Sequence, residues 1–319
     1  MKEIGGYLGL EQFVHHEYYS NLISLNNARN ALLYILKART IRKLYIPYFL
    51  CDSVSELCDR EGYSYEFYHI DSCFQPIFEQ TLAPNEYLYI VNYYGQIDNS
   101  QIAALKDRYQ RIIVDNVQAF FQQPLDGIDT IYSCRKFFGV PDGAYLSTSA
   151  VLETDLPEDI SKDRMRHLLG RFEGKCASDY YEDFKLANYA FSELELRTMS
   201  RLTHNLLGAI DYYGAKQKRE RNYAFLNALL KSCNKLVLKD AVGPYAYPFY
   251  CNNGIEVKRK LAEKKIYVPT LWPNVRNLEG TLEKDYAENI LPLPCDQRYD
   301  FDDMNRIVEE VLNLYMKGV

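Results

Sequence analysis

The sequence lacks the features of several large classes of protein. It has one tryptophan, five methionines and five histidines in 319 residues. No apolar stretch approaches the roughly 20 residues that span a bilayer. The first residues, MKEIGGYLGLEQF, contain no continuous apolar core and no cleavage pattern of a secretory signal. These absences favour a cytoplasmic protein that does not cross a membrane.

Cysteine and histidine are present without the spacing of a metal site. The eight cysteines form no C-x-x-C pair, and His15–His16 is the only histidine pair. We therefore expect reduced thiols, no disulfide framework and no bound metal. Cys134 lies two residues before a lysine, but no His and Asn arrangement accompanies it. Packing in the core explains Cys134 better than a nucleophilic thiol does.

The charge balance and the missing phosphate motifs exclude further classes. The net charge is -6 and the only dense basic run, residues 216–221, is interrupted by Glu220. A nucleic-acid surface usually needs a basic stripe, so no nucleic-acid partner is expected. No G-x-G-x-x-G or P-loop follows any apolar run, which disfavours a nicotinamide enzyme. The 29 tyrosines suit a cleft or an interface, and equally the edge of a core.

Short apolar runs alternate with amphipathic segments in the first half of the chain. This alternation predicts an α/β fold with a largely parallel sheet covered by helices. Ligands of such sheets bind beyond the carboxyl ends of the strands, where Pro47, Asn92, Asp115 and Ser133 stand. The expected strands cover residues 44–46, 65–68, 87–91, 111–114, 130–132 and 144–146, and the expected helices lie near 28–38, 52–61 and 99–109.

The second half reads as a helical stretch followed by a small mixed unit. Residues 155–232 are mostly helix-like, with one long candidate helix at 205–231. The sequence therefore predicts a large domain over 1–205 and a small α+β domain over 206–319 that begins with this helix. Within the small domain we expect strands at 245–251 and 266–268 and helices near 255–264 and 301–316.

A carboxylate ends one of the predicted strands. The segment RIIVDNVQAFF places Asp115 after a mostly apolar run and Gln118 three residues later. Pyridoxal 5'-phosphate (PLP) requires a buried carboxylate to keep its ring nitrogen protonated, so that the ring can withdraw electrons. Gln118 would then donate to the phenolic oxygen of the ring. Asp115 alone is equally compatible with a cap on the following helix.

A lysine stands between aromatic residues and a glycine turn. In YSCRKFFGVPDGAYL, Lys136 is followed by two phenylalanines and then by the turn at Gly143. A lysine that is partly removed from water has a lowered pKa and can form a Schiff base with an aldehyde. The alternative is a surface lysine whose stem packs on the aromatic rings.

The third element is a helix start. In SLNNARNALLYIL, Asn27 is a good N-cap, and the free amides of Ala28 and Arg29 would suit a phosphate group. The side chain of Arg29 would add positive charge. An amphipathic helix with a capped end and no ligand would have the same sequence.

The order of these elements along the chain resembles that of the DegT/DnrJ/StrS group of sugar aminotransferases, which have the fold type I of PLP enzymes. NARNAL resembles the helix start of that family, IPYFLCDSV its strand end, and VNYYGQIDNSQIAAL its segment of Val, His, Gly and Ile. DNVQAFF resembles its Asp-x-x-Gln-Ala motif, and YSCRKFFGVPDGAYL its Ser-to-Lys segment. KKIYVPTLWP and ILPLPCDQRYDFDDMNRIVEEVL resemble its return loop and its closing strand and helix.

The resemblance implies a fold and a set of roles. The large domain would hold a mostly parallel seven-stranded sheet flanked by helices. Lys136 would form the imine with PLP, Asp115 would hold the pyridine nitrogen, and Gln118 would contact the phenolic oxygen. Ser133 and the amides of Ala28 and Arg29 would bind the phosphate. The protein would be a cytoplasmic homodimer, with the segment at 197–200 near the contribution of the second subunit.

The chain also departs from the family in the residues that would face the ligand. Leu50 and Cys51 replace the usual Thr and aromatic residue, and Asn92 replaces the usual His. The residue that stacks on the ring is therefore open, with Tyr93, Tyr94 and Phe49 as candidates. Trp272 either lines the cleft or anchors the small domain.

The leading hypothesis is an aminotransferase that moves an amino group from an amino acid to a keto-sugar. We expect this sugar to be nucleotide-linked and to serve polysaccharide or related sugar biosynthesis. Two alternatives are a PLP enzyme that acts on another carbonyl compound, and a non-catalytic homodimer that binds or regulates.

Overall fold

The computed structural model describes residues 6–13, 15–174 and 176–316. Of the N-terminal stretch considered above, residues 1–5 lie outside the described part. The first half of the chain forms one large sheet whose strands follow the order β1-β8-β7-β6-β5-β2-β3-β4. The strands are β1 (Ile23–Leu25), β2 (Lys43–Pro47), β3 (Ser64–Ile70), β4 (Pro76–Ile77), β5 (Glu86–Val91), β6 (Ile112–Asp115), β7 (Asp129–Ser133) and β8 (Ala144–Ser147).

The pairing confirms the predicted α/β class. Strands β3, β2, β5, β6 and β7 are joined in parallel, whereas β1, β8 and β4 pair in the antiparallel direction. All six strands expected in the first half are present. The sheet has eight strands where seven were expected. One strand, β4, has two residues and carries no pattern that a sequence could reveal.

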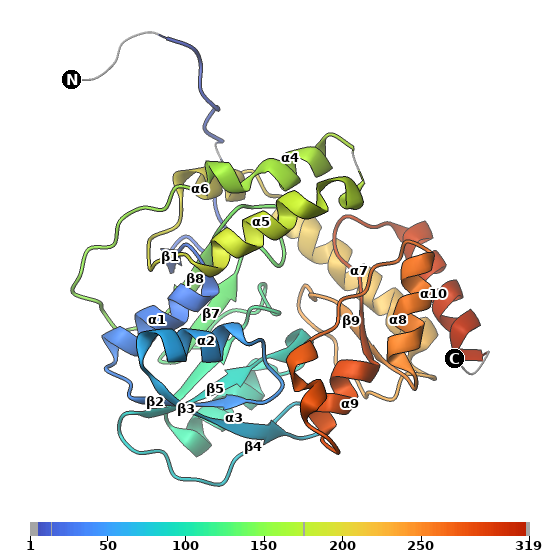
Figure 1. Cartoon of the computed structure of the whole chain (residues 1–319), viewed down its shortest axis with the longest axis horizontal. Coiled ribbons are helices and arrows are strands. Elements are labelled where there is room, and N and C mark those ends of the chain that lie inside the picture. The colour runs from blue at the N-terminus through green and yellow to red at the C-terminus, as the bar shows by residue number, and fades with distance from the viewer. Residues whose placement is uncertain (1–5, 14, 175, 317–319) are drawn as a thin grey trace.

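Helices of the parallel units cover the sheet, and their ends follow from their caps. They are α1 (Ala28–Ala38), α2 (Ser53–Glu61) and α3 (Asn99–Tyr109). The side chain of Asn27 accepts a hydrogen bond from the Asn30 amide at 2.7 Å and so begins α1. Asp98 and Gln101 form a reciprocal capping box at the start of α3. Helices α4 (Arg166–Phe172), α5 (Tyr181–Ser192) and α6 (Arg201–Leu207) form a group at one side of the molecule, at the top in Figure 1.

The last third of the chain builds a second, smaller sheet. Its elements are α7 (Tyr212–Leu230), β9 (Tyr247–Tyr250), α8 (Gly254–Glu263), α9 (Leu282–Asn289), β10 (Ile290–Leu293) and α10 (Phe301–Met316). Strands β9 and β10 pair in the antiparallel direction. Helices α7, α8 and α10 gather around them at the right in Figure 1 and enclose a separate apolar core that includes Tyr247, Phe249 and Leu291.

Two expectations about this half were wrong. The single helix at 205–231 is two helices, because α6 ends at Gly208 and the side chain of Asp211 caps the new start of α7 through the Gly214 amide. The run 266–268 forms no strand; Ile266 is buried beside α8 directly after Lys265 turns the chain with φ 60°. The stretch 155–232 is mostly helical, as expected, although residues 155–161 before α4 are irregular. Within the described residues, no helix is long and apolar enough to cross a membrane.

The N-terminal segment is tied to α6 by an ion pair. His204 Nδ1 lies 2.6 Å from Glu17 Oε1, and the hydroxyl of Tyr145 donates to the same carboxylate. The hydrogen bond to Glu17 raises the pKa of His204 above its usual value. Because the folded-state pKa is the higher one, this pair stabilises the fold at pH values below the unfolded pKa of about 6.5.

This contribution disappears as the pH rises through the raised pKa of His204. We expect the variant His204→Gln to melt at a lower temperature than the natural protein at about pH 6, and the two melting temperatures to converge at about pH 9. Thermal unfolding followed by circular dichroism at both pH values tests this. The variant His69→Gln is the control. It replaces a histidine that also contacts a glutamate, Glu283, but in another part of the molecule. An equal deficit of His204→Gln at both pH values would contradict the argument.

Candidate active site

The carboxylate of Asp115 lies at the carboxyl end of β6 and is almost fully buried. The hydroxyl of Tyr89 donates to its Oδ2 at 2.7 Å, and the amide of Val117 donates to its Oδ1 at 2.9 Å. Burial raises the pKa of Asp115, while the nearby ammonium of Lys136 and these two donors act in the opposite direction. The carboxylate is therefore held in a fixed orientation at the edge where ligands of parallel sheets bind.

Lys136 lies in the turn that follows β7 and is partly buried. The turn is closed by hydrogen bonds from the amides of Phe137 and Phe138 to the carbonyl of Cys134. The ammonium of Lys136 faces the ring of Tyr245, with 5.7 Å between Nζ and the ring centroid. The structure thus brings Lys136 and Asp115 into one region, although 20 residues separate them in the sequence.

Gln118 carries a donor without an acceptor. Its side chain is completely buried, and its Oε1 accepts a hydrogen bond from the amide of Tyr94 at 2.9 Å. Its Nε2 has no hydrogen-bond partner among the described residues, and neither has the hydroxyl of Tyr94. A buried amide without an acceptor costs about 1–3 kcal/mol and therefore calls for a ligand or a water molecule.

The start of α1 and the end of β7 hold the residues that were expected to bind a phosphate. Within the described part of the chain, the amides of Ala28 and Arg29 have no hydrogen-bond acceptor, as is usual for a first helical turn. Ser133 is the last residue of β7 and pairs with Ala144 of β8. The carbonyl of Asn26, just before α1, accepts a hydrogen bond from the Gly143 amide at 2.7 Å and so joins the helix start to the lysine turn.

Tyr93 and Phe49 belong to an aromatic cluster and not to an open face. The hydroxyl of Tyr93 donates to the carbonyl of Phe49 at 2.6 Å, and the rings of both contact Trp272. Tyr93, Phe49 and Trp272 are all buried. Trp272 therefore anchors the C-terminal segment against the strand end after β2, and the amide of Asn274 donates to the carbonyl of Leu50 beside it.

The residues that depart from the family pattern have different surroundings. Asn92 is buried and joins the loops after β5 and β6, since its side chain bonds to Ile97, Asn116 and Gln122. Cys51 is exposed at the end of the β2 segment, near Tyr89 and Arg29. The thiol of Cys51 consequently lies beside the tyrosine that holds Asp115.

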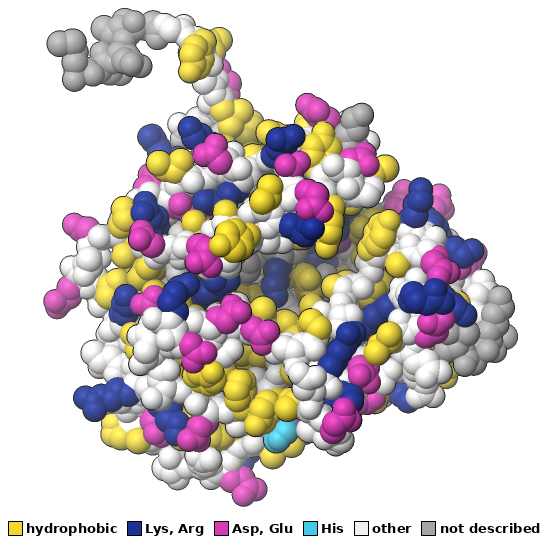
Figure 2. Space-filling model, in the orientation of Figure 1, with side chains coloured by type: hydrophobic (Ala, Val, Ile, Leu, Met, Phe, Trp, Pro, Cys, Tyr) yellow, Lys and Arg dark blue, Asp and Glu magenta, His cyan; other side chains and the backbone are white. Residues whose placement is uncertain are grey.

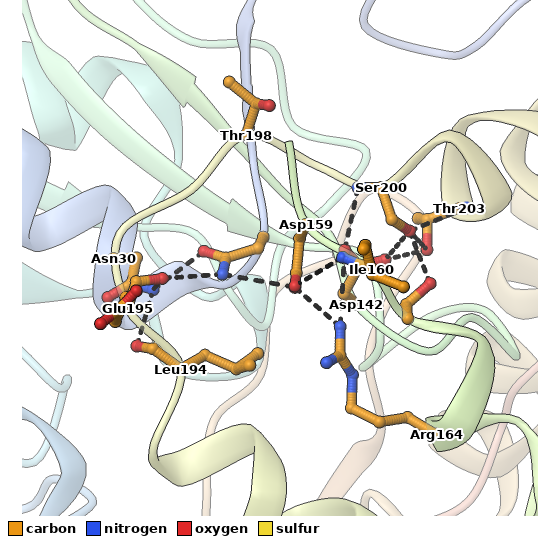
Figure 3. Close-up of polar contacts among 12 residues, drawn as sticks. Asn30, Asp142, Asp159, Ile160, Arg164, Leu194, Glu195, Thr198, Ser200 and Thr203 are labelled. Carbon is orange, nitrogen blue, oxygen red and sulfur yellow. Dashed lines mark hydrogen bonds and ion pairs between the residues drawn. The ribbon is translucent and has the colours of Figure 1, made fainter. Parts of the chain in front are cut away.

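A buried polar network packs against the lysine turn, the turn after β7 that carries Lys136 (Figure 3). Asp142, in the Gly143 turn, accepts hydrogen bonds from the amide and hydroxyl of Ser200 and from the hydroxyl of Thr203. Arg164 bonds to Asp159 at 2.7 Å and approaches Asp142 at 4.0 Å. The network joins the turn to α6 and to the segment before α4, so the turn cannot move without breaking several bonds in a dry interior.

The same network reaches the start of α1. The side chain of Asn26 donates to Asp159 and to the carbonyl of Glu195, and Asn30 donates to the carbonyls of Leu194 and Glu195 (Figure 3). The segment 197–200, expected near the second subunit, lies along β1 of its own chain through the hydrogen bonds of Asn26 with Arg197 and of Met199 with Ser24.

Arg219 of α7 clamps the lysine turn from the other side. Its guanidinium donates to the carbonyl of Pro244 at 2.8 Å and to that of Phe137 at 3.2 Å, and its Nε donates to Gln297 at 2.6 Å. Gln297 also donates to the carbonyl of Phe137, at 2.8 Å. Phe137 directly follows Lys136, and Pro244 directly precedes Tyr245. Arg219 therefore holds a chain neighbour of each of the two residues, Lys136 and Tyr245, whose side chains face each other.

One face of the molecular surface is hollowed. Figure 2 shows a hollow in the face of the molecule that lies between α5 and the C-terminal elements. Among the described residues, no group of three or more His, Cys, Asp or Glu side chains could hold a metal ion. The polar chemistry of the region therefore rests on Lys136, Asp115, Gln118 and nearby arginines.

Comparison with known proteins supports the fold but not the sequence family. No family model matches the sequence. No curated protein matches it either. Solved structures do match: a DegT DnrJ EryC1 StrS aminotransferase from Brucella abortus superposes with a TM-score of 0.62 at 16% identity, covering 92% of this chain and 85% of the other.

Two further structures agree. The sugar aminotransferase CalS13 from Micromonospora echinospora gives a TM-score of 0.58 at 17% identity and covers 91% of this chain and 86% of that one. The NtdA protein from Bacillus subtilis, solved with bound cofactor PMP, gives 0.65 at 13% identity, with 92% and 72% covered. The chain has the fold of the sugar aminotransferases. The fold that the resemblance implied is thereby confirmed, and at these identities the likeness concerns the fold alone.

Several residues around the site were missed by sequence reasoning. Tyr89 could have been found, because it stands two residues before Val91 on the same face of β5, and Val91 is in register with Asp115. Arg219, Gln297 and Tyr245 are more than 80 residues from Lys136 in the sequence. No local pattern marks them, because their role depends on how α7 and the loops around it dock on the lysine turn.

Replacing Arg219 tests the clamp. The variant Arg219→Met leaves the carbonyl of Pro244 and the side chain of Gln297 without their donor, and we expect it to lower the free energy of unfolding by about 3 kcal/mol. The exposed Arg221 of the same helix provides the control, and Arg221→Met should change the free energy by no more than about 0.5 kcal/mol. Urea unfolding measures both. Equal stability of the two variants would show that the guanidinium does not hold the turn.

Proposed function

We propose that this protein is a PLP-dependent aminotransferase that moves an amino group from an amino acid to a nucleotide-linked keto-sugar, in polysaccharide or related sugar biosynthesis. The observation that carries the proposal is the buried carboxylate of Asp115 at a strand end, with the ammonium of Lys136 close enough to influence its pKa. The fold shared with sugar aminotransferases supports it. The cytoplasm, a homodimeric assembly and the domain division at 205/206 belong to the proposal.

The residues present fit the cofactor. Asp115 is a buried acceptor for a protonated ring nitrogen, and Gln118 Nε2 is a buried donor that lacks an acceptor in the described part of the chain. The free amides of Ala28 and Arg29 suit a phosphate dianion at a helix start, and the hydroxyl of Ser133 would be a further donor to it. PLP, when bound, supplies an aldehyde that condenses with amines and a ring that withdraws electrons from them.

Each side chain then has a task of its own. Lys136 Nζ would accept the proton that leaves the carbon bearing the donor's amino group and would give this proton back to complete the transfer of the amino group. Tyr89 and the Val117 amide hold the carboxylate of Asp115, which would accept a hydrogen bond from the protonated ring nitrogen of PLP. The ring of Tyr93 packs against the rings of Phe49 and Trp272, so Tyr93 would form part of the wall of the site.

A second candidate is a PLP-binding protein without transaminase activity or with another carbonyl substrate. The exposed Cys51, in place of the aromatic residue that the family uses, favours this alternative. A cofactor that stays unchanged when amino acids are added would select it.

Lys136 provides the first test. The purified protein mixed with PLP should develop a visible absorption band, and borohydride reduction should fix the cofactor on the peptide that contains Lys136. The variant Lys136→Ala should show neither, whereas Lys218→Ala, on the helix α7 outside the proposed site, should behave as the natural protein does. Mass spectrometry of the reduced protein locates the label. A label on another lysine would overturn the proposal.

Asp115 provides the second test. In Asp115→Asn the ring nitrogen loses its negative partner, so the reaction with the amino donor should slow by about a hundredfold or more, equivalent to about 3 kcal/mol for a broken buried pair. Asp129→Asn removes another buried carboxylate, which pairs with Arg39 at the opposite end of β7, and should lose stability without this loss of rate. Single-turnover absorption changes measure the rates. Equal rates in Asp115→Asn and the natural protein would contradict the assignment.

Cys51 reports on the site without any activity. A maleimide reagent should label the exposed thiols of Cys51, Cys73 and Cys176 in the absence of ligand. Bound PLP should slow the labelling of Cys51, because this thiol lies beside the tyrosine that holds Asp115, and should leave Cys73 and Cys176 unaffected. Peptide mass spectrometry over time gives the three rates. Unchanged labelling of Cys51 at saturating PLP would place the cofactor elsewhere.

A further inference from the structure

Tyr94 has a backbone conformation that bulky residues rarely adopt. It lies in η1 (Tyr93–Gly95), the short 3-10 turn directly after β5, with φ 55° and ψ 14°. Six non-glycine residues of the described chain have a positive φ, and of these only Tyr94 and Phe74 are buried. A left-handed backbone is unfavourable for a bulky residue, so it persists only where the surroundings require it.

The loop that contains Tyr94 is held at both ends. Asn92, just before the turn, bonds through its side chain to the loop after β6. Gln96, just after the turn, bonds to Tyr223 of α7 and to the main chain of Lys239. These bonds fix both ends of the turn, so the backbone of Tyr94 has little freedom to relax.

In this conformation the amide of Tyr94 points at the side chain of Gln118. Its N–H donates to Oε1 of Gln118 at 2.9 Å. An N–H bonds only to the oxygen end of a carboxamide, so this bond decides how the side chain of Gln118 is oriented. The Nε2 end is buried and has no acceptor among the described residues.

The orientation of Gln118 matters for the cofactor. The two ends of a carboxamide have almost the same shape, and only hydrogen bonds distinguish one orientation from the other. The phenolic oxygen of PLP is a hydrogen-bond acceptor. It is therefore suited by the Nε2 end of Gln118 and repelled by the Oε1 end.

We propose that Tyr94 is a positioning residue for the cofactor. Its left-handed backbone amide holds Gln118 in the one orientation that offers a donor to the phenolic oxygen of PLP. Tyr94 acts through Gln118, with its main chain, and not by stacking its ring on the cofactor. The inference rests on the proposed function, because it takes PLP as the ligand and Gln118 as a residue that contacts it.

The test compares PLP with 3-deoxypyridoxal 5'-phosphate, an analogue without the phenolic oxygen. Tyr94→Val and Tyr94→Asn both lose the ring, but valine disfavours the left-handed conformation whereas asparagine tolerates it. Gln118→Ala removes the positioned side chain. Gln110→Val is the control for backbone strain, because Gln110 has φ 61° at the C-cap of α3. Calorimetry gives each affinity, and circular dichroism shows which variants fold.

The measured quantity is the preference for PLP over the analogue. The natural protein and Gln110→Val should bind PLP about tenfold or more tightly, as expected of one hydrogen bond to a charged oxygen. Tyr94→Val and Gln118→Ala should lose this preference, and Tyr94→Asn should keep most of it. The double variant Tyr94→Val/Gln118→Ala should lose no more than either single variant. General damage to the site would weaken both compounds equally and would leave the preference unchanged.

A second measurement needs neither cofactor nor a folded Tyr94→Val. In the natural protein the amide of Tyr94 should exchange its hydrogen slowly, because it is buried and bonded to Gln118. In Gln118→Ala it should exchange about tenfold faster or more, while the amide of Asn92, which donates to the carbonyl of Asp115, should keep its rate. Hydrogen exchange followed by NMR gives both rates.

The proposal is overturned if folded Tyr94→Val keeps the natural preference, if Tyr94→Asn loses it as fully as Tyr94→Val does, or if the natural protein does not distinguish the two compounds. An unchanged exchange rate of the Tyr94 amide in Gln118→Ala overturns it as well. A natural protein that binds neither compound would refute the proposed function, and the exchange rates would then still decide whether Tyr94 holds Gln118.

Discussion

The guanidinium of Arg219 holds together the parts of this protein that would have to cooperate in chemistry. This guanidinium is almost fully buried. It donates hydrogen bonds to two backbone carbonyls and to the side-chain amide of Gln297, and not to a carboxylate. Through Phe137 it fixes the turn of Lys136, and through Pro244 it fixes the loop of Tyr245. A charge kept in a dry interior is costly unless every donor is bonded, so this position tolerates few geometries. The turn that carries Lys136 is bonded to this guanidinium and is therefore rigid as well.

The opposite side of the turn is held by a different kind of interaction. Asp142 collects hydrogen bonds from Ser200 and Thr203, and Asn26 links the neighbouring Asp159 to the start of α1. The lysine turn and the amides of the first helical turn are thus parts of one network. A site that must hold a ring at one end and a phosphate at the other benefits from such a connection, because the distance between its two ends cannot drift.

Uncompensated charge is the common theme of the region. Asp115 is buried at the end of β6 beside a single ammonium group, and Arg29 and Arg135 are partly buried without an acid. Each arrangement costs free energy of folding that a purely structural role would not require. In natural proteins such unfavourable arrangements occur mainly where a bound ligand offsets them. This is the physical reason to interpret this edge of the sheet as a binding site.

Local patterns predicted much of the fold. The Asn27 cap and the apolar spacing that follows it placed α1 at its observed bounds, and the six apolar runs of the first half are all strands. Runs such as those of β5 and β6 are apolar because a buried parallel strand needs a continuous apolar segment. Local patterns failed where tertiary contacts decide. The two-residue β4 exists only because β3 offers an edge, and the run at 266–268 forms no strand, with Ile266 buried and Tyr267 exposed.

The same distinction between local patterns and tertiary contacts applies to the candidate site. The sequence by itself determined which groups are available: the carboxylate of Asp115 at a strand end, the amine of Lys136 before a glycine turn, and the free amides of Ala28 and Arg29. Only the tertiary structure decided their surroundings, since Tyr89, Arg219 and α5 come from segments far apart in the chain. Burial and electrostatic environment depend on distance in space, and no spacing along the sequence reports that distance for residues that meet across separate elements.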